Sequence, residues 1–527
     1  MKKGIIIILM GMLVGCSSQE IKKERLEQNK ISYEEVKDTS ENSFKEKYEK
    51  LSPVERISFY KQYGYPQDNF PKSREIEYLK AIKETRGKKE FFYSPNKKTF
   101  LEFYKDLTIR GYGDNSNYWR WTFSLSEKEL TSLINRNLPL IADKRPREIL
   151  TYSNGQWVRK KVGKDPIGTL KEIRVMERGK SGVIIKLMVK GSKGTYLIIK
   201  EQNVRGLLGG KYVNIYGSKG GVEKYTDKPI SKGASSLPSA YFAIEKDKNV
   251  YKFYGGGYGH GVGMSQWGVY DLTNNFGYNY KEVLQRYYKG TKIIDKNKVP
   301  GLGDKIRVGI MTTGFKSLDH EKIVLTSTRH MIIHNKYINI ETKNRDIVSF
   351  ISKNGMINIY VNHKLKAKTR YPIKIECPKA MISVLSIKRH HRKFNYPTYR
   401  GDFEIRLSAN NNHKLTLINE IDIERYLYQV LPSEMPEGFG LEALKVQAVA
   451  ARTYALSDYK KNRYKNLGFH ITDSTQSQVY NNLDENETSR EAINATKGDI
   501  LLYNNELVDA KYYSTSSGYG ANADNIW

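Results

Sequence analysis

Apolar and polar residues alternate along much of this 527-residue chain with the period of two that is typical of half-exposed β-strands. We expect strands in the alternating runs at residues 118–123, 173–177, 182–190, 194–200, 306–311, 322–327, 356–361, 371–376, 403–407, 500–503 and 507–513. Helical spacing is less common, and it predicts helices at residues 45–62, 74–86, 125–134 and 489–496 and a longer one after Gly440. The chain is therefore expected to fold as an α+β protein, with β-rich antiparallel sheets, a few helices and a small N-terminal helical region.

The helix after Gly440 has apolar residues at every third or fourth position. We expect this stripe to face the core; its members are Leu441, Leu444, Ala448 and Ala451. Residues outside the stripe are then available for function, among them Lys445, Gln447 and Arg452.

The first sixteen residues have the pattern of an export signal. Two lysines follow Met1, and residues 4–15 are apolar but too few to cross a bilayer as a stop-transfer helix. The run Leu13-Val14-Gly15-Cys16 resembles a bacterial lipobox, which predicts a lipoprotein signal peptide at 1–16 and a lipid on Cys16. The alternative is an ordinary cleaved signal peptide that contains a cysteine. The mature protein is expected outside the cytoplasm, anchored to a membrane by its lipid, with residues 17–115 as a tether and helical region.

The net charge of +31 predicts an anionic partner. Nucleic acid is excluded by the export signal and by the lack of zinc-finger or RNP patterns, so cell wall or lipid headgroups are expected instead. The basic run at 388–393 is interpreted as a solvated loop rather than a dedicated polyanion site. With Cys16 lipidated, Cys377 has no cysteine partner, and we expect it to be a small core residue.

Glu434 is the strongest candidate for chemistry. It lies in the run Pro432-Ser433-Glu434-Met435-Pro436, between strands and the long helix. Apolar neighbours would raise the pKa of the carboxyl group, and a carboxylic acid that is protonated near neutral pH can donate to a glycosidic oxygen. The alternative, that Glu434 caps the following helix, is equally compatible with the residues.

A glycine-rich run, G-G-G-Y-G-H-G-V-G-M-S-Q-W-G at 255–268, is the second candidate. It has neither the spacing of a dinucleotide-binding fingerprint nor the ending of a P-loop. Its glycines would let the backbone approach a ligand closely, while His260 and Gln266 supply hydrogen bonds. The alternative is a glycine-rich strand that only packs tightly.

Several of these motifs together resemble the SpoIID/LytB family, which includes stage II sporulation protein D and the amidase enhancers. The similar motifs are V-L-P-S-E-M-P, A-L-K-V-Q-A-V-A-A-R-T-Y-A-L, S-Q-V-Y, Y-S-T-S-S-G and G-Y-G-H-G-V-G-M-S-Q-W-G, spread over residues 118–293 and 305–527. The resemblance implies that the protein binds or cleaves peptidoglycan glycan strands in a cleft, as a lytic transglycosylase that needs no cofactor.

The family's catalytic glutamate corresponds to Glu434, which would act first as acid and then as base, so that no second carboxylate is required. We expect the substrate-binding residues to be Ser433, Arg452, Gln478, His260, Ser265 and Gln266. The alternative function is a non-catalytic peptidoglycan-binding protein that enhances a wall amidase, an N-acetylmuramoyl-L-alanine amidase.

The chain departs from the family in two ways. In some members the residues just before the Q-V-Y segment resemble a zinc site built from His and Cys. Here that segment has no cysteine, and His470 alone is a poor site, so no metal is expected. The glycine-rich half (116–300) also precedes the P-S-E-M-P half (301–527), whereas the family has the opposite order. The domain is circularly permuted, or two partial copies are present, or the gene is truncated or misjoined; permutation is slightly favoured because the halves complement each other.

Overall fold

A computed structural model of the protein describes residues 76–86, 97–389, 396–409, 411 and 413–526. Cys16, the predicted signal peptide and the predicted helix at 45–62 lie outside the described residues. Within the described ranges no helix is both long enough and apolar enough to cross a membrane. The mixture of helices and antiparallel sheets confirms the α+β class.

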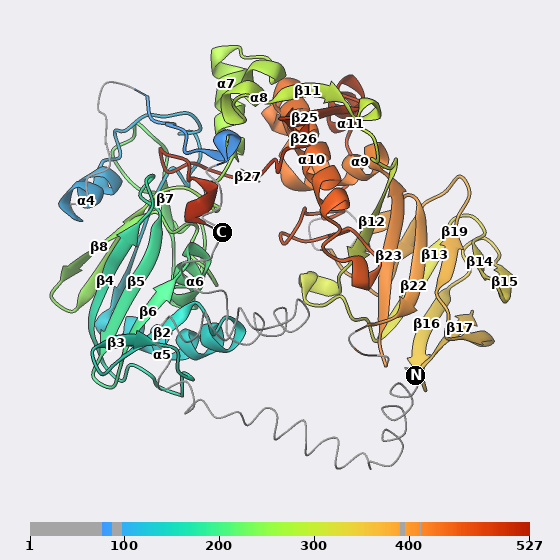
Figure 1. The fold of residues 1–527 in the computed structure, drawn as a ribbon, viewed down its shortest axis with the longest axis horizontal. Coiled ribbons are helices and arrows are strands. Elements are labelled where there is room, and N and C mark those ends of the chain that lie inside the picture. Colours follow the sequence, from blue (N-terminus) through green and yellow to red (C-terminus); the bar gives the residue numbers. More distant parts are fainter. Residues whose placement is uncertain (1–75, 87–96, 390–395, 410, 412, 527) are drawn as a thin grey trace, which may run out of the picture.

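The first lobe contains two antiparallel sheets with helix α5 packed against both (Figure 1). The sheets have the strand orders β7-β1-β9-β8 and β3-β2-β6-β5-β4. The elements are α4 (Lys97–Lys105), β1 (Arg120–Ser126), α5 (Glu127–Lys144), β2 (Ile149–Ser153), β3 (Gln156–Val158), β4 (Leu170–Arg178), β5 (Ile184–Gly191), β6 (Thr195–Ile199), α6 (Glu201–Leu207), β7 (Tyr216–Ser218), β8 (Phe242–Asp247) and β9 (Val250–Gly255).

A second lobe, on the right in Figure 1, consists of two larger sheets whose apolar faces pack on each other. Their strand orders are β15-β14-β19-β22-β23-β12-β24 and β18-β17-β16-β13-β20-β21. The strands are β12 (Lys305–Ile310), β13 (Lys322–Ser327), β14 (Ile332–Asn335), β15 (Ile338–Glu341), β16 (Val348–Lys353), β17 (Met356–Val361), β18 (Lys364–Thr369), β19 (Ile373–Glu376), β20 (Ile382–Val384), β21 (Thr398–Tyr399), β22 (Asp402–Leu407), β23 (Leu415–Asp422) and β24 (Ile471–Thr472).

A helical layer joins the two lobes (Figure 1). It draws its elements from the middle of the chain, residues 264–295, and from its C-terminal part, residues 423–513. Each predicted strand named above overlaps a strand of the structure. The elements are β10 (Met264–Ser265), α7 (Gln266–Phe276), α8 (Tyr280–Tyr287), β11 (Lys292–Asp295), α9 (Ile423–Glu434), α10 (Leu441–Lys461), α11 (Glu487–Ala495), β25 (Asp499–Tyr503), β26 (Glu506–Leu507) and β27 (Tyr512–Tyr513).

Strands from the two halves of the sequence pair directly. Strand β10 runs parallel to β27, and β11 pairs antiparallel with β25. Single bridges extend this contact, from Tyr258 to Thr515 and from Val262 to Ala521. Backbone hydrogen bonds of this kind are lost if the partner strand is removed, so neither half can satisfy its polar groups alone.

Helix α10 is buried on almost every side, which differs from the predicted single apolar stripe. Gln447 and Arg452, expected to be available for function, are both fully buried. The helix packs against α7, α8, α9, α11 and strand β25, so it has no solvent face along most of its length. A helix enclosed in this way needs small residues rather than a polar side, and its run of alanines provides them.

The predicted helix at 74–86 is wrong for its described part. Apart from one 3₁₀ turn at Glu77–Leu79, residues 76–86 are not helical. The amides of Glu84 and Thr85 donate to the carbonyl of Gly518, and the amide of Arg86 donates to that of Arg110. Tertiary pairing has therefore overridden a local helical pattern.

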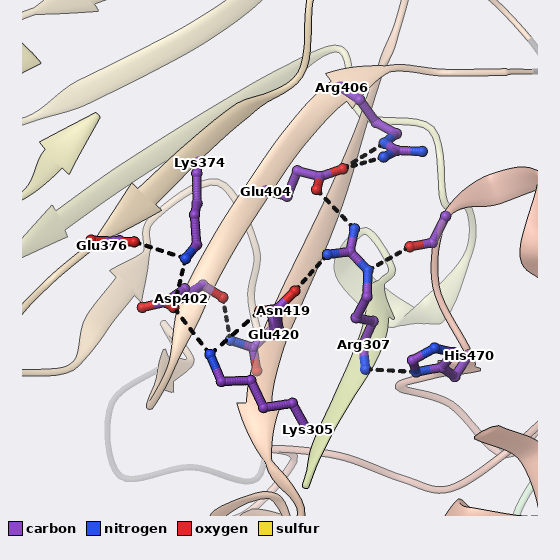
Figure 2. Close-up of polar contacts among 11 residues, drawn as sticks. Lys305, Arg307, Lys374, Glu376, Asp402, Glu404, Arg406, Asn419, Glu420 and His470 are labelled. Atoms are coloured by element: carbon purple, nitrogen blue, oxygen red, sulfur yellow. Dashed lines mark hydrogen bonds and ion pairs between the residues drawn. The ribbon is translucent and has the colours of Figure 1, made fainter. Parts of the chain in front are cut away.

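Charged side chains cover the outward face of the seven-stranded sheet (Figure 2). Arg307 pairs with Glu420 at 2.6 Å and with Glu404 at 2.9 Å, and its amide donates to Nδ1 of His470. Lys305 and Lys374 both approach Asp402. These charges neutralise one another, so this face does not account for the basic excess of the chain.

The basic run at 388–393 is described only at its first two residues: Lys388 is exposed, as expected of a solvated loop, but Arg389 is buried. Arg389 is 1% exposed and donates to Asp473 at 2.6 Å, to the carbonyl of Met311 at 2.9 Å and to that of Thr312 at 3.2 Å. Its guanidinium also lies 4.2 Å from the ring centroid of Phe315. Cys377 is buried, as expected, and lies within 3.1 Å of the Ser327 hydroxyl.

Candidate functional site

Glu434 is the last residue of α9, so it ends one helix rather than beginning the next. Pro436 cannot continue the helix and disfavours helical geometry in the residue before it, and Met435 is extended at φ −133° and ψ 131°. The following helix α10 begins after Gly440 with no side-chain cap. The alternative that Glu434 caps this helix is therefore wrong.

Glu434 is a partly buried residue, and its carboxyl group has two donors. The amide of Val479 donates to Oε1 over 2.5 Å, and the hydroxyl of Tyr512 also hydrogen-bonds the carboxyl. Burial raises the pKa of Glu434 to about 7, against the lowering effect of those two donors. Its place at the C-terminal end of α9 works in the same direction as burial, because that end of a helix disfavours negative charge. The group is thus poised between acid and base near neutral pH.

Gln478 orients the hydroxyl of Tyr512. The amide nitrogen of Gln478 donates to the Tyr512 oxygen at 3.0 Å and to the carbonyl of Ala451 at 3.2 Å, and its carbonyl accepts from Tyr426 at 3.2 Å. Since an amide NH₂ can only donate, the Tyr512 oxygen accepts, and its own proton is directed to Glu434. Burial raises the pKa of Tyr512 well above its usual value, so the hydroxyl keeps this proton.

The last residues of the glycine-rich run lie beside Glu434. Gln266, 9% exposed, donates to the backbone carbonyl of Glu434 at 3.0 Å and to Oε1 of Gln447 at 3.3 Å. Ser265 is fully buried and caps α7 by accepting from the amide of Gly268. The ring centroid of Trp267 lies 4.9 Å from that of Phe439, a residue of the segment that connects Glu434 to α10. The structure therefore brings Gln266 and Glu434 together, although 168 residues separate them.

His260 holds the strand that carries Tyr512. Its Nδ1 accepts from the amide of Val262 at 3.1 Å, so Nε2 bears the proton, and the ring bonds the backbone of Tyr512. Burial lowers the pKa of His260 to about 3, and the nearby cations of Lys511 and Arg205 contribute. The imidazole is neutral at physiological pH and positions Tyr512 rather than exchanging protons.

Arg452 does not lie with these residues. It is 0% exposed and forms a two-pronged ion pair with Glu424, at 2.8 and 2.6 Å. It also donates to the carbonyl of Asp499. We therefore withdraw Arg452 as a substrate-binding residue, because its guanidinium is enclosed and already paired.

Ser433 and Gln478 are structural neighbours of Glu434 rather than exposed contacts. The Ser433 hydroxyl donates to the carbonyl of Gln429 and accepts from the amides of Asn482 and Leu483. Gln478 is fully buried. Among the residues that the structure describes, no group of three or more His, Cys, Asp or Glu side chains could hold a metal ion.

Tyr512 is the functional residue that sequence reasoning missed. It comes five residues after the predicted strand start at Leu507, with no motif around it that signals chemistry. Only the pairing of β27 with β10 delivers it to Glu434. A usable signal was the position of Tyr512 just before Y-S-T-S-S-G, one of the motifs that carry the family resemblance.

Parts of this chain are similar in sequence to known proteins. The sequence model of the SpoIID family, described as stage II sporulation protein, matches residues 411–503, which include Glu434 and Gln478. A stretch of 98 residues is 39% identical to the amidase enhancer of Bacillus subtilis, covering 19% of this chain and 13% of that protein. A stretch of 124 residues is 37% identical to stage II sporulation protein D of Bacillus subtilis, covering 21% and 36%.

An uncharacterized protein of Brachyspira hyodysenteriae is 36% identical over 117 residues, covering 22% of this chain and 32% of that protein. The chain thus spans about a third or less of the length of these relatives. The matched family segment ends before Tyr512 and does not include the glycine-rich run.

Proposed function

We propose that this chain, whose residues 411–503 match the SpoIID family, is a peptidoglycan-cleaving enzyme of the lytic transglycosylase type with Glu434 as its acid and base. The observation that supports the proposal is the carboxyl of Glu434, which accepts from the amide of Val479 and whose pKa burial raises to about 7. A carboxyl of this kind is half protonated near neutral pH, as a group that must both give and take a proton requires.

The proposed reaction has two proton transfers. Oε1 of Glu434 accepts from the amide of Val479, so the acidic proton lies on Oε2. Oε2 gives this proton to the glycosidic oxygen as the bond to the sugar's C1 breaks and an oxocarbenium-like state forms. The resulting carboxylate, stabilised by Val479 and Tyr512, then accepts the proton of the same sugar's 6-hydroxyl as that oxygen attacks C1. The product is an anhydro sugar, and no water is consumed.

The experiment uses two glutamates three residues apart. Glu434→Gln keeps an acceptor for the Val479 amide but cannot donate an acidic proton, so release of anhydro-muropeptides from purified peptidoglycan should fall by about 100-fold or more. Glu437 is exposed and bonds Thr488, so Glu437→Gln is the matched control and should keep full activity. Equal activity of wild type and Glu434→Gln would refute the assignment.

A second candidate function is binding of peptidoglycan to enhance a separate amidase. It is favoured by the identity to a protein that bears the name amidase enhancer. In that case Glu434→Gln would leave both wall binding and stimulation of an N-acetylmuramoyl-L-alanine amidase intact. Measuring stimulation and anhydro-muropeptide release on the same variant separates the two functions.

Both functions require the protein to reach the wall, and we propose that a lipid on Cys16 holds it at a membrane outside the cytoplasm. The support is the lipobox-like run Leu13–Cys16. Cys16→Ser should release the protein from the membrane fraction. Continued membrane association of that variant would argue against lipidation.

We also propose that residues 116–300 and 301–527 form one SpoIID-type domain in permuted order. The support is the pairing of β10 with β27 and of β11 with β25, together with the bond from Gln266 to Glu434. The four larger sheets each lie within one half, so this support rests on the two small sheets that cross between the halves.

A further inference from the structure

A cavity of about 190 Å³ opens beside the glycine-rich run, on the first lobe. Its polar and aromatic lining consists of Tyr118, Arg205, Ser231, Ser235, Ser236 and Tyr258. None of these residues takes part in the proton transfers proposed above. The cavity has room for about one sugar ring or a short substituent, well below the size of a drug-sized pocket.

The walls of this cavity are fixed by backbone hydrogen bonds. The segment 231–238 is tied down where Ile215 donates to Ser231 at 2.8 Å and Gly210 donates to Ala234 at 2.7 Å. Nε of Arg205 donates to the carbonyl of Leu237 at 2.9 Å, which sets the direction of the guanidinium. A site whose walls are already ordered pays little entropy on binding.

The lining combines two kinds of contact. The rings of Tyr118 and Tyr258 lie with their centroids 4.7 Å apart, and Tyr258 is 44% exposed, so it presents an apolar face to a ligand. Arg205 adds a cation whose side chain is 18% exposed and which pairs with Glu201 over 3.4 Å. A guanidinium is the side chain best suited to a carboxylate, and the serine hydroxyls suit sugar hydroxyls.

The cavity is connected to the Glu434 site through strand β27. Tyr258 exchanges backbone hydrogen bonds with Thr515, which follows Tyr512 by three residues. Three residues span at most about 11 Å. The amide of Gly257 donates to the carbonyl of Tyr118, so the glycine-rich run is a wall of the cavity and also leads to His260. The cavity and the Glu434 site are therefore linked by a short stretch of backbone.

We propose that this cavity is a subsite for a carboxylate-bearing sugar of the glycan strand, an inference that rests on the proposed function. The sugar ring packs on Tyr258, and its carboxylate pairs with Arg205. In peptidoglycan the carboxylate has two sources: the lactyl group of a sugar without peptide, or the peptide attached to that group. Either source distinguishes wall glycan from chitin, whose sugars carry no carboxylate.

The test measures binding on the full chain carrying Glu434→Gln, so that strands stay intact. The probes are chitin oligomers, peptide-free peptidoglycan strands and peptide-bearing strands. Arg205→Gln should weaken binding of a carboxylate-bearing strand by about tenfold and leave chitin binding unchanged. Ser235→Phe, a change at an exposed serine that fills the cavity, should weaken every probe. Tyr337→Ala, at a tyrosine 63% exposed on the other lobe, is the control and should have no effect.

Each outcome decides something. If Arg205→Gln loses affinity only for peptide-free strands, the carboxylate is that of the lactyl group. If it loses affinity only for peptide-bearing strands, the carboxylate belongs to the peptide. Both results support the subsite. Unchanged strand affinity in Arg205→Gln and Ser235→Phe, an equal effect on chitin, or no strand binding at all would overturn it. The proposed function fails by a different result, namely cleavage by the Glu434→Gln protein itself.

Discussion

The hydroxyl of Tyr512 should set the pH at which Glu434 loses its proton. Tyr512→Phe removes one of the two donors to the carboxylate and keeps the ring, so the burial of Glu434 is nearly unchanged. The carboxylate form loses stabilisation while the protonated form does not. The pKa of Glu434 must therefore rise from its value of about 7.

The size of this rise follows from the strength of the bond. A hydrogen bond to a charged group contributes about 1.5–3 kcal/mol, and a pKa change of one corresponds to about 1.4 kcal/mol. Removing the Tyr512 donor should therefore move the pKa to about 8–9. Because the first step needs the protonated acid, the alkaline limb of the rate profile should move to higher pH by the same amount.

The assay is the pH dependence of kcat/KM for release of anhydro-muropeptides. Tyr428→Phe is the control, since Tyr428 lies on α9 but bonds Asn494 rather than Glu434. An alkaline limb that stays in place in Tyr512→Phe, or moves to lower pH, would refute the reasoning. A fall in rate at every pH without a shift would instead indicate that Tyr512 contacts substrate only.

Three further predictions concern stability and assembly. The pKa of Glu434, raised from 4.5 to about 7, means that its stabilising contribution is complete below pH 4.5 and lost as the pH rises through 7. Glu434→Gln should therefore have a free energy of unfolding higher than that of wild type by up to about 3 kcal/mol at pH 8, and nearly the same one at pH 4.5. A difference in unfolding free energy that does not change with pH would contradict this. Asp473→Asn leaves the buried guanidinium of Arg389 without its ion pair, and urea unfolding should show a loss of about 3–5 kcal/mol, whereas an unchanged midpoint would show that the pair is dispensable. A chain in which residues 301–527 precede residues 116–300 should fold and melt in one transition if the halves form one domain; aggregation or two transitions would count against permutation.

The local pattern of residues was sufficient for many of the strands and for the burial of Glu434. Alternation of apolar and polar side chains depends only on the pleat, so runs such as 322–327 and 356–361 are strands in the structure as well. The apolar neighbours of Glu434 predicted burial, which is the first cause of its raised pKa. The pattern failed for Arg452, because the helical stripe says which side is apolar and cannot say that a helix is enclosed on all sides.

The sequence by itself determined which residues were candidates for chemistry: a glutamate between two prolines, followed by a helix, and a glycine-rich run with His260 and Gln266. The tertiary structure decided which of them meet. Parallel pairing of β10 with β27 delivers Tyr512 to Glu434 and Gln266 to the end of α9. The physical reason is that backbone pairing between distant strands leaves no local trace in composition or periodicity, since any extended segment can accept the same hydrogen bonds. Which residues lie close together is therefore decided by the folded chain, whereas the chemistry of each side chain is given by the sequence.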